Sequence, residues 1–456
     1  MTTLDTQHPV AVLGAGPVGL AAAAHLVSRG LTPLVLEAGD EVAASFRSVA
    51  HVRLFSPWRY NLDRAARQLL EAQGWTPPDL DALPTAGALV DDYLTPLAAH
   101  PALQPHMRFG ARVESVSRQG LDKVKTDGRA GAPFVIRTVE DGVAHEYLAA
   151  AVIDATGTWQ QPNPAGADGR PALGEIEARA RIAYGMPDVA GAMRARYRGR
   201  RVLVLGAGHS AAGSLLALAR LANEEPATRI VWAVRGASLT RIFGGGDRDG
   251  LPARGALGAD LAQLEREGRL EVHLRFQLRE IVPHGDALRL VGHARDGVVP
   301  QIDGIDEVIV ATGARPDVTM WRELRVRLDP WLESTEALAP LIDPNVHSCG
   351  TVRPHGHREL AHPEPGFYVI GAKSYGRAPN FLMATGYEQA RSVVAALAGD
   401  LAAADDVQLE LPETGVCSTD LAPAAACCGT APAPAASCGD TCGVERPAPA
   451  AAGCCG

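Results

Sequence analysis

The sequence predicts an α/β protein made of two similar three-layer domains, one inserted into the other, followed by a cysteine-rich tail. A short apolar strand, a glycine-rich turn and an alanine-rich helix occur in this order twice, from Pro9 and again from Arg200. Each copy later reaches another apolar strand that ends in Ala-Thr-Gly, at 155–157 and 311–313. From about residue 403 the chain is rich in Ala, Pro, Gly and Cys and almost without hydrophobic periodicity, which predicts disorder in the absence of a ligand.

The composition of the chain limits the classes of function that it can have. The chain has 456 residues, 46% of them hydrophobic and 21% charged, which is enough for two or three domains with large cores. A net charge of -9 without a basic stripe gives no reason to expect nucleic acid. The sequence shows no signal-peptide pattern and no apolar run long enough to cross a membrane, so we expect a cytoplasmic protein with no membrane partner.

The first glycine turn has the spacing of a dinucleotide-binding turn. Gly14 permits the tight turn, Gly16 lets a pyrophosphate approach the backbone, and Gly19 allows the helix to pack closely on the strand. Glu37 ends the next apolar strand, about 20 residues further on, where a carboxylate binds ribose hydroxyls. The region 1–165 is therefore predicted to be the first part of a Rossmann-like dinucleotide-binding domain.

The second turn predicts another such domain over 198–316. Its third glycine is replaced by alanine, which this fingerprint tolerates. The following strand ends in Arg235, which would pair with a 2′-phosphate and so favours NADPH over NADH, unless it is an ordinary solvated residue. The residues expected to bind this cofactor are Gly206, Gly208, Ser210, Ala211 and Arg235.

Taken together, the two turns, the two Ala-Thr-Gly exits and a later strand ending at Gly371 resemble the flavin-containing monooxygenase and thioredoxin-reductase-like superfamily. The resemblance covers about residues 8–400. It implies FAD bound by 1–165 and by a last segment, 317–402, with NADPH bound by the inserted domain. The last FAD motif of this superfamily usually continues with aspartate, whereas Ala372 follows here. The residues that the resemblance assigns to FAD are Gly14, Gly16, Gly19, Glu37, Ser45, Phe46, Arg47, Leu54, Val113, Gly157 and Gly371.

The positions of the cysteines separate two chemistries of such flavoproteins. A dithiol reductase needs a cysteine pair beside the flavin, but the chain has no cysteine before Cys349. This favours the reaction of reduced flavin with molecular oxygen, and hence a monooxygenase with a small-molecule substrate. The stretch 181–188 lacks the Phe and His of the FxGxxxHxxx fingerprint, which argues against a standard Baeyer–Villiger or N-oxide reaction.

Several segments show a closer resemblance, to the flavin monooxygenases encoded in bacterial arsenic-resistance operons. These are VAVLGAGPVGLAAAAHL, YGMPDV, LGAGHSA, RPHG and KSYGRAPNFLMATGYEQ. The resemblance implies oxidation of a trivalent arsenical, with oxygen as co-substrate. A homodimer is left open.

Polar residues around the last flavin strand are candidates for the substrate side. Cationic groups there would stabilise developing negative charge, and a histidine would shuttle protons. The alternative is a solvated polar loop. Asn380 and Phe381 are expected to border the flavin ring, with simple packing as the alternative. The predicted catalytic residues are Arg353, His355, Lys373, Tyr375 and Arg377.

The tail contains two vicinal cysteine pairs and a third, more widely spaced pair. Thiolates bind soft ions, and trivalent arsenic is one of them, while the spacing does not fit a zinc finger. Two further functions therefore stay open: an NADPH-dependent reductase of thiol-bound metal or metalloid that uses the tail, and a soft-metal-binding flavoprotein without turnover. The alternative is a plain low-complexity extension with adventitious thiols. The predicted metal or metalloid ligands are Cys427, Cys428, Cys438, Cys442, Cys454 and Cys455.

Overall fold

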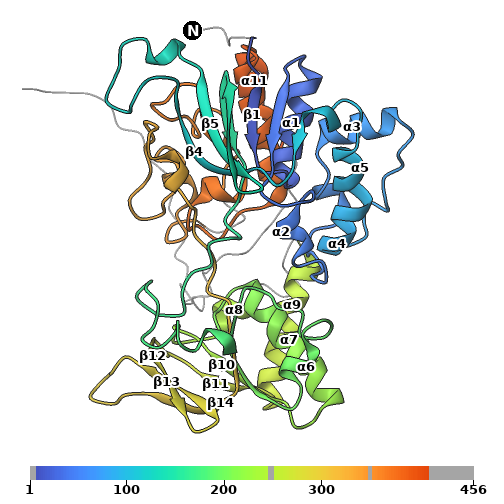
Figure 1. Cartoon of the computed structure of the whole chain (residues 1–456). Coiled ribbons are helices and arrows are strands. Elements are labelled where there is room, and N and C mark those ends of the chain that lie inside the picture. Colours follow the sequence, from blue (N-terminus) through green and yellow to red (C-terminus); the bar gives the residue numbers. More distant parts are fainter. Residues whose placement is uncertain (1–6, 245–250, 348–351, 410–456) are drawn as a thin grey trace, which may run out of the picture. The chain divides into compact units, whose positions relative to one another are not determined.

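The computed structural model describes residues 7–244, 251–347 and 352–409 (Figure 1). Within them lie two five-stranded parallel sheets, each accompanied by a three-stranded antiparallel sheet. This arrangement confirms the predicted α/β class with two Rossmann-like domains. Residues 403–405, predicted to begin the disordered tail, belong instead to a short helix, α12 (Leu401–Asp405), and the tail beyond residue 409 lies outside the described residues.

The first parallel sheet has the strand order β16-β7-β1-β2-β3. Its central strands consist of apolar residues that are all buried, as expected for parallel strands covered on both faces, except that β7 ends in a buried aspartate. The strands are β1 (Val10–Leu13), β2 (Pro33–Leu36), β3 (Met107–Arg108), β7 (Ala151–Asp154) and β16 (Phe367–Val369).

Different layers cover the two faces of this sheet. Val10 and Val12 of β1 pack with the helices α1 (Pro17–Ser28) and α11 (Met383–Leu397), which lie beside each other (Figure 1). Ala11 and Leu13 of the same strand face the antiparallel sheet instead. That sheet consists of β4 (Arg112–Arg118), β5 (Phe134–Glu140) and β6 (Val143–Ala149).

The second parallel sheet repeats the plan with the order β11-β10-β9-β15-β8. Val202 and Val204 pack against helices on one face, and Leu203 and Leu205 pack against the other antiparallel sheet. The strand β8 lies before residue 198, the predicted start of this domain, and pairs with β15. With three residues, β8 is too short to produce a recognisable periodicity. The elements are β8 (Ile182–Tyr184), β9 (Arg201–Leu205), β10 (Arg229–Ala233), β11 (Glu271–His273), β15 (Glu307–Val310), α7 (His209–Glu224), α9 (Pro252–Arg266), β12 (Leu278–His284), β13 (Ala287–Gly292) and β14 (Gln301–Ile305).

Shorter helices connect these layers. The longest of them, α3, begins after Asp63, whose carboxylate accepts a hydrogen bond from the amide of Ala66 as an N-cap. None of the helices in the described ranges is long and apolar enough to cross a membrane. The remaining α-helices are α2 (Ala44–Arg47), α3 (Arg64–Ala72), α4 (Ala86–Leu89), α5 (Thr95–Ala98), α6 (Arg194–Tyr197), α8 (Thr240–Phe243), α10 (Ala339–Ile342) and α12 (Leu401–Asp405).

Candidate functional site

The first glycine turn lies at the carboxyl end of β1, where the strand order of the sheet reverses and such folds bind ligands. Gly14 has a φ of 93°, and a Cβ on Gly19 would lie 2.0 Å from the carbonyl oxygen of Gly14. A Cβ on Gly16 would instead meet no atom within 4 Å. Gly16 also caps α1, which begins without a side-chain cap. The geometry thus leaves the amino end of α1 open for the predicted pyrophosphate.

Glu37 is held beside this turn by two backbone amides. Its Oε2 accepts a hydrogen bond from Ala15 (2.6 Å) and its Oε1 accepts one from Gly39 (2.9 Å). The carbonyl of Glu37 accepts a hydrogen bond from Ala111 (2.8 Å), two residues before Val113. The structure therefore brings Glu37 and the start of β4 together at the glycine turn, which suits an adenosine half of FAD at this place.

The residues expected along the flavin lie on α2 and on the loop that follows it. Phe46 and Leu54 are half-buried and pack on the first core. Ser45 is half-buried on the same helix. Arg47 contacts Asp91 at 2.5 Å and Glu41 at 3.4 Å, and the hydrogen bond that it donates to Asp91 raises the pKa of the guanidinium. Arg47 is therefore engaged by carboxylates of its own chain.

The exit of β7 is built around a buried ion pair. The Nζ of Lys373 lies 2.8 Å from Asp154 Oδ2 and 2.8 Å from Thr156 Oγ1. Both charged side chains have 0% of their surface exposed. Gly157 follows with a φ of 70° and open space where a Cβ would stand. Lys373, which was expected on the substrate side of the flavin, is thus a buried cation in contact with the Ala-Thr-Gly exit at Thr156.

The last flavin motif is fixed by Gln389 of α11. Its Oε1 accepts a hydrogen bond from the amide of Gly371 (2.7 Å), and its Nε2 donates to Ser374 Oγ (2.9 Å) and lies 3.0 Å from His355 Nε2. Since the amide nitrogen of Gln389 only donates, His355 Nε2 accepts and its Nδ1 donates to the carbonyl of Arg353 (3.0 Å). Burial of the imidazole lowers the pKa of His355. Both ring nitrogens are therefore used, and this geometry favours a positioning role over the expected proton shuttle.

Aromatic and amide side chains continue this motif toward α11. Tyr375 is buried, and the centre of its ring lies 5.6 Å from that of His355 and 5.2 Å from that of Phe381. Asn380 is buried, and its Nδ2 donates to the carbonyl of Ile342 (3.3 Å), but its Oδ1 has no hydrogen-bond partner among the described residues. A buried amide oxygen without a donor is unfavourable, so a bound group with a donor would fit here. Together with the open space at Gly16, this makes the residues present compatible with FAD.

The other two predicted catalytic residues are exposed. Arg353 and Arg377 both lie at the surface, and the amide of Arg377 donates to the carbonyl of Leu332 (2.7 Å). The same loop as Arg353 also carries His357, whose Nε2 lies 2.9 Å from Asp405. Of the five predicted catalytic residues, the structure therefore brings His355, Lys373 and Tyr375 to the buried side of the last flavin motif.

The second glycine turn has the same construction as the first. A Cβ on Gly206, with a φ of 142°, would lie 2.2 Å from the carbonyl oxygen of Ala311, whereas Gly208 is open and caps α7. In the first turn of α7, Ala211 is buried and the carbonyl of Ser210 accepts a hydrogen bond from Ser214 (3.0 Å). Arg235 follows β10 at the surface, and one of its nitrogens donates to the carbonyl of Ala167 (3.3 Å).

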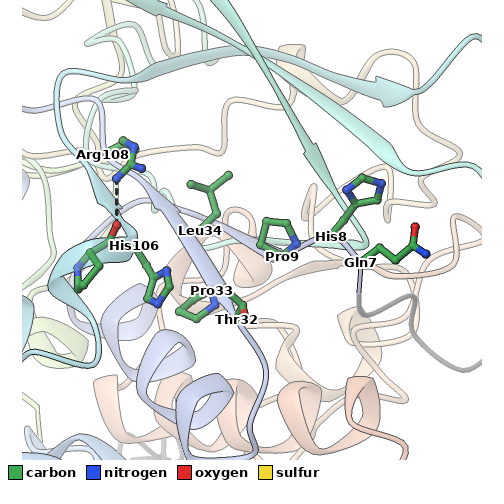
Figure 2. A pocket seen from close by; sticks show the side chains of 9 residues that line it. Gln7, His8, Pro9, Thr32, Pro33, Leu34, His106 and Arg108 are labelled. Atoms are coloured by element: carbon green, nitrogen blue, oxygen red, sulfur yellow. Dashed lines mark hydrogen bonds between the residues drawn. The ribbon is translucent and has the colours of Figure 1, made fainter.

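The expected metal ligands Cys427, Cys428, Cys438, Cys442, Cys454 and Cys455 all lie outside the described residues. Among the residues that are described, no group of three or more His, Cys, Asp or Glu is placed to hold a metal ion. A hollow of about 210 Å³ lies at the amino ends of β1 and β2, the edge opposite the glycine turn, and Figure 2 shows the side chains that line it. It is lined by Gln7, His8, Pro9, Thr32, Pro33, Leu34, Pro105, His106 and Arg108.

Sequence reasoning missed two residues of this site. Asp154 is a charged residue at the end of an otherwise apolar strand, directly before Ala-Thr-Gly, and that position was the available signal. Gln389 lies on a helix whose residues from Thr385 to Ala395 are all buried, and a polar residue within such a run needs a partner. Both are buried and hydrogen-bonded to the predicted FAD motifs.

Comparisons with known proteins agree with this geometry. A model of the family described as pyridine nucleotide-disulphide oxidoreductases matches residues 11–349. The probable indole-3-pyruvate monooxygenase YUCCA1 of Arabidopsis thaliana is 30% identical over 220 residues, 46% of this chain and 45% of that protein. The chain thus matches about half the length of this curated relative.

Two solved structures share the fold. One is the bacillithiol disulfide reductase Bdr of Bacillus cereus, with a TM-score of 0.63, 19% identity, and coverage of 86% of this chain and 99% of that chain. The other is the FAD-bound cadaverine monooxygenase DfoA of Erwinia amylovora, with a TM-score of 0.60, 14% identity, and coverage of 90% and 97%. At these identities, the two structures support the fold and leave the reaction to be argued from the site.

Proposed function

Because the chain belongs to the pyridine nucleotide-disulphide oxidoreductase family, we propose that it is an NADPH- and FAD-dependent monooxygenase of a small substrate. Membership confirms the expected class of enzyme, an FAD-dependent oxidoreductase that uses a pyridine nucleotide. The reaction, the substrate and the roles of individual residues belong to the proposal.

The observation that carries the proposal is the absence of cysteine from the sequence before Cys349. A reductase that passes electrons from flavin to a disulfide needs a thiol pair next to the flavin. The described flavin motifs contain Lys373, Tyr375 and Asn380 instead of such a pair. Oxygen accepts electrons from reduced flavin without a protein thiol, and YUCCA1 is named as a monooxygenase.

Each cofactor has a defined set of candidate residues. Gly16 and Glu37 would hold the pyrophosphate and ribose of FAD, and Gly371 and Asn380 would border its flavin. FAD supplies the two-electron chemistry when bound. Arg235 is exposed at the end of β10 and would pair with the 2′-phosphate of NADPH, which is the reason to prefer NADPH over NADH.

We take trivalent arsenicals as the substrate class. The segments RPHG and KSYGRAPNFLMATGYEQ resemble the arsenic-operon monooxygenases, and the vicinal cysteines of the tail suit a thiophilic substrate. In a balanced reaction, NADPH gives two electrons, one oxygen atom of O₂ is transferred to arsenic, which becomes pentavalent, and the other leaves as water. The tail would capture the arsenical before oxidation.

The test follows oxygen consumption and NADPH oxidation together in the purified holoenzyme, with and without phenylarsine oxide. The proposal expects uptake of one O₂ per NADPH, stimulated by the arsenical, with little hydrogen peroxide released. Arsenical-dependent oxidation of NADPH that persists under nitrogen would contradict it.

A reductase that uses the tail cysteines is the second candidate. Two observations favour it: seven cysteines lie beyond Cys349, and the family is described as disulphide oxidoreductases. Truncation after residue 409 separates the two, because it removes all seven cysteines beyond Cys349. The monooxygenase keeps arsenical-stimulated oxygen uptake at saturating substrate, whereas the reductase loses turnover. A soft-metal-binding flavoprotein would oxidise NADPH slowly, without stimulation, in both forms.

A further inference from the structure

Asp154 is the last residue of β7, and Lys373 lies four residues after the end of β16, next to Ala372, which replaces the expected acid. We propose that this pair is a positioning device for FAD, because it locks the Ala-Thr-Gly exit to the Gly371 turn. The inference rests on the FAD site, and it is independent of whether the reaction is the proposed oxygenation.

Lys373 is held on three sides. Its Nζ donates to Asp154 Oδ2 and to Thr156 Oγ1, each at 2.8 Å, and lies 4.5 Å from the centre of the Trp321 ring. No part of its side chain is exposed. A buried ammonium is tolerated only when such partners replace water, so its position is fixed by these contacts.

Asp154 accepts four hydrogen bonds, which satisfy both of its oxygens. Oδ2 accepts from Trp321 Nε1 (2.7 Å) and from Lys373, while Oδ1 accepts from the amide (2.9 Å) and the hydroxyl (2.7 Å) of Thr156. The carboxylate therefore orients Thr156 directly. Thr156 immediately precedes Gly157, the glycine that the resemblance assigns to FAD.

The cluster joins three chain segments that are far apart in sequence. Asp154 and Thr156 belong to the first Ala-Thr-Gly exit, Trp321 follows the second exit at 311–313, and Lys373 belongs to the last flavin motif. The segments meet at the carboxyl edge of the first sheet, the edge that carries the Gly14 turn. A change in the pair therefore moves the two FAD motifs relative to each other.

The two charges do not have equal roles. Without Lys373, Asp154 keeps three donors, so the carboxylate stays largely satisfied. Without the charge of Asp154, the ammonium keeps a hydroxyl and an aromatic ring, which leaves a buried cation poorly compensated. Asp154→Asn should therefore harm the site more than Lys373→Met, and adding Lys373→Met to Asp154→Asn should restore part of what was lost.

The experiment measures FAD bound per polypeptide, the dissociation constant for FAD and the visible absorption band of the bound flavin. It uses the full chain carrying Asp154→Asn, Lys373→Met and both together, without NADPH or substrate. We expect FAD to bind at least about tenfold more weakly to Asp154→Asn, with a shifted flavin band, and the double variant to regain part of the lost affinity. A tenfold change corresponds to about 1.4 kcal/mol. Should Asp154→Asn fail to fold, Thr156→Val removes an acceptor of Lys373 without changing charge.

A matched control is the ion pair Glu388–Arg391, which joins side chains 6% and 9% exposed at 2.7 Å within α11. Arg391→Met should lower stability and leave the flavin band and the FAD dissociation constant unchanged. The proposal is overturned if Lys373→Met and Thr156→Val bind FAD with unchanged affinity and spectrum, or if the double variant is as weak as the sum of the single changes. Because NADPH and substrate are absent from the binding measurement, failure of the monooxygenase proposal would leave this result unchanged.

Discussion

Gln389→Leu tests whether the last flavin motif depends on one buried amide. The side chain has 0% exposure and makes three contacts: to the Gly371 amide (2.7 Å), Ser374 Oγ (2.9 Å) and His355 Nε2 (3.0 Å). Leucine leaves the Gly371 amide and the His355 nitrogen without their partners, while Ser374 keeps its bond to the Gly371 carbonyl. Two orphaned buried groups at about 1–3 kcal/mol each lower the free energy of unfolding by about 2–6 kcal/mol.

The assay is urea denaturation of the holoenzyme, followed by flavin fluorescence, at a pH above 7, where His355 is neutral. Gln68→Leu is the control, because Gln68 is an exposed glutamine on α3 of the same domain. A double-mutant cycle with His355→Leu should give a coupling of about 0.5–3 kcal/mol, since the two side chains are in contact. Equal midpoints for Gln389→Leu and Gln68→Leu, or strict additivity in the cycle, would refute the reasoning.

Three further outcomes are expected. Burial lowers the pKa of His362 from 6.5 to about 4, so the folded protein binds this proton less readily than the unfolded chain does. The contribution of His362 to stability is therefore full above pH 6.5, and the free energy of unfolding falls by up to about 3 kcal/mol toward pH 4. Urea midpoints at pH 7.5 and at pH 4.5 should differ less in His362→Leu than in the unchanged protein. Gly19→Ala should prevent folding of the first turn, because its Cβ would lie 2.0 Å from the Gly14 carbonyl oxygen. Gly16→Ala should instead keep the thermal midpoint of the apoprotein and lower its affinity for FAD, and equal behaviour of the two variants would contradict this geometry. Arg235→Leu should raise the KM for NADPH by about tenfold or more, because it loses a charge-assisted hydrogen bond of about 1.5–3 kcal/mol, and should leave the KM for NADH unchanged. A parallel rise in both KM values would argue against a contact with the 2′-phosphate.

The fold was predictable because its signals are local. The strand before Gly14, the turn and the alanine-rich helix lie within one short stretch, and the same grammar returns at Gly206. Strand β8 shows the limit, since three residues carry no periodicity and only the pairing with β15 assigns them to the second sheet. Local pattern therefore gave the class and the two turns, but not where the second sheet begins.

The flavin motif was less predictable because its contacts join distant positions. Lys373 and Asp154 are separated by 219 residues and His355 and Gln389 by 34. Residue type suggested that His355 and Lys373 belong near the flavin. Their burial and partners, which favour positioning over proton transfer, depend on packing that one sequence does not reveal.

The place at which the tail is cut decides what a truncation means. The helix α12 (Leu401–Asp405) crosses the predicted boundary between 402 and 403, and its end is bonded to α11. Arg391 donates to the carbonyls of Ala403 and Asp406, both at 2.5 Å, and Ser392 Oγ donates to that of Ala404 (2.7 Å). A chain ending at 402 loses all three acceptors, so at about 1–3 kcal/mol each its free energy of unfolding should fall by about 3–9 kcal/mol, whereas a chain ending at 409 keeps them.

Urea midpoints of the two truncated proteins and the full chain measure this difference. We expect the chain ending at 409 to match the full chain and the chain ending at 402 to unfold at lower urea, and equal midpoints would contradict the role of α12. The distinction matters for the reaction, because a chain ending at 402 would lose turnover by unfolding more readily during the assay. That loss would imitate a reductase that depends on the tail, so only the cut after 409 separates the two proposed chemistries.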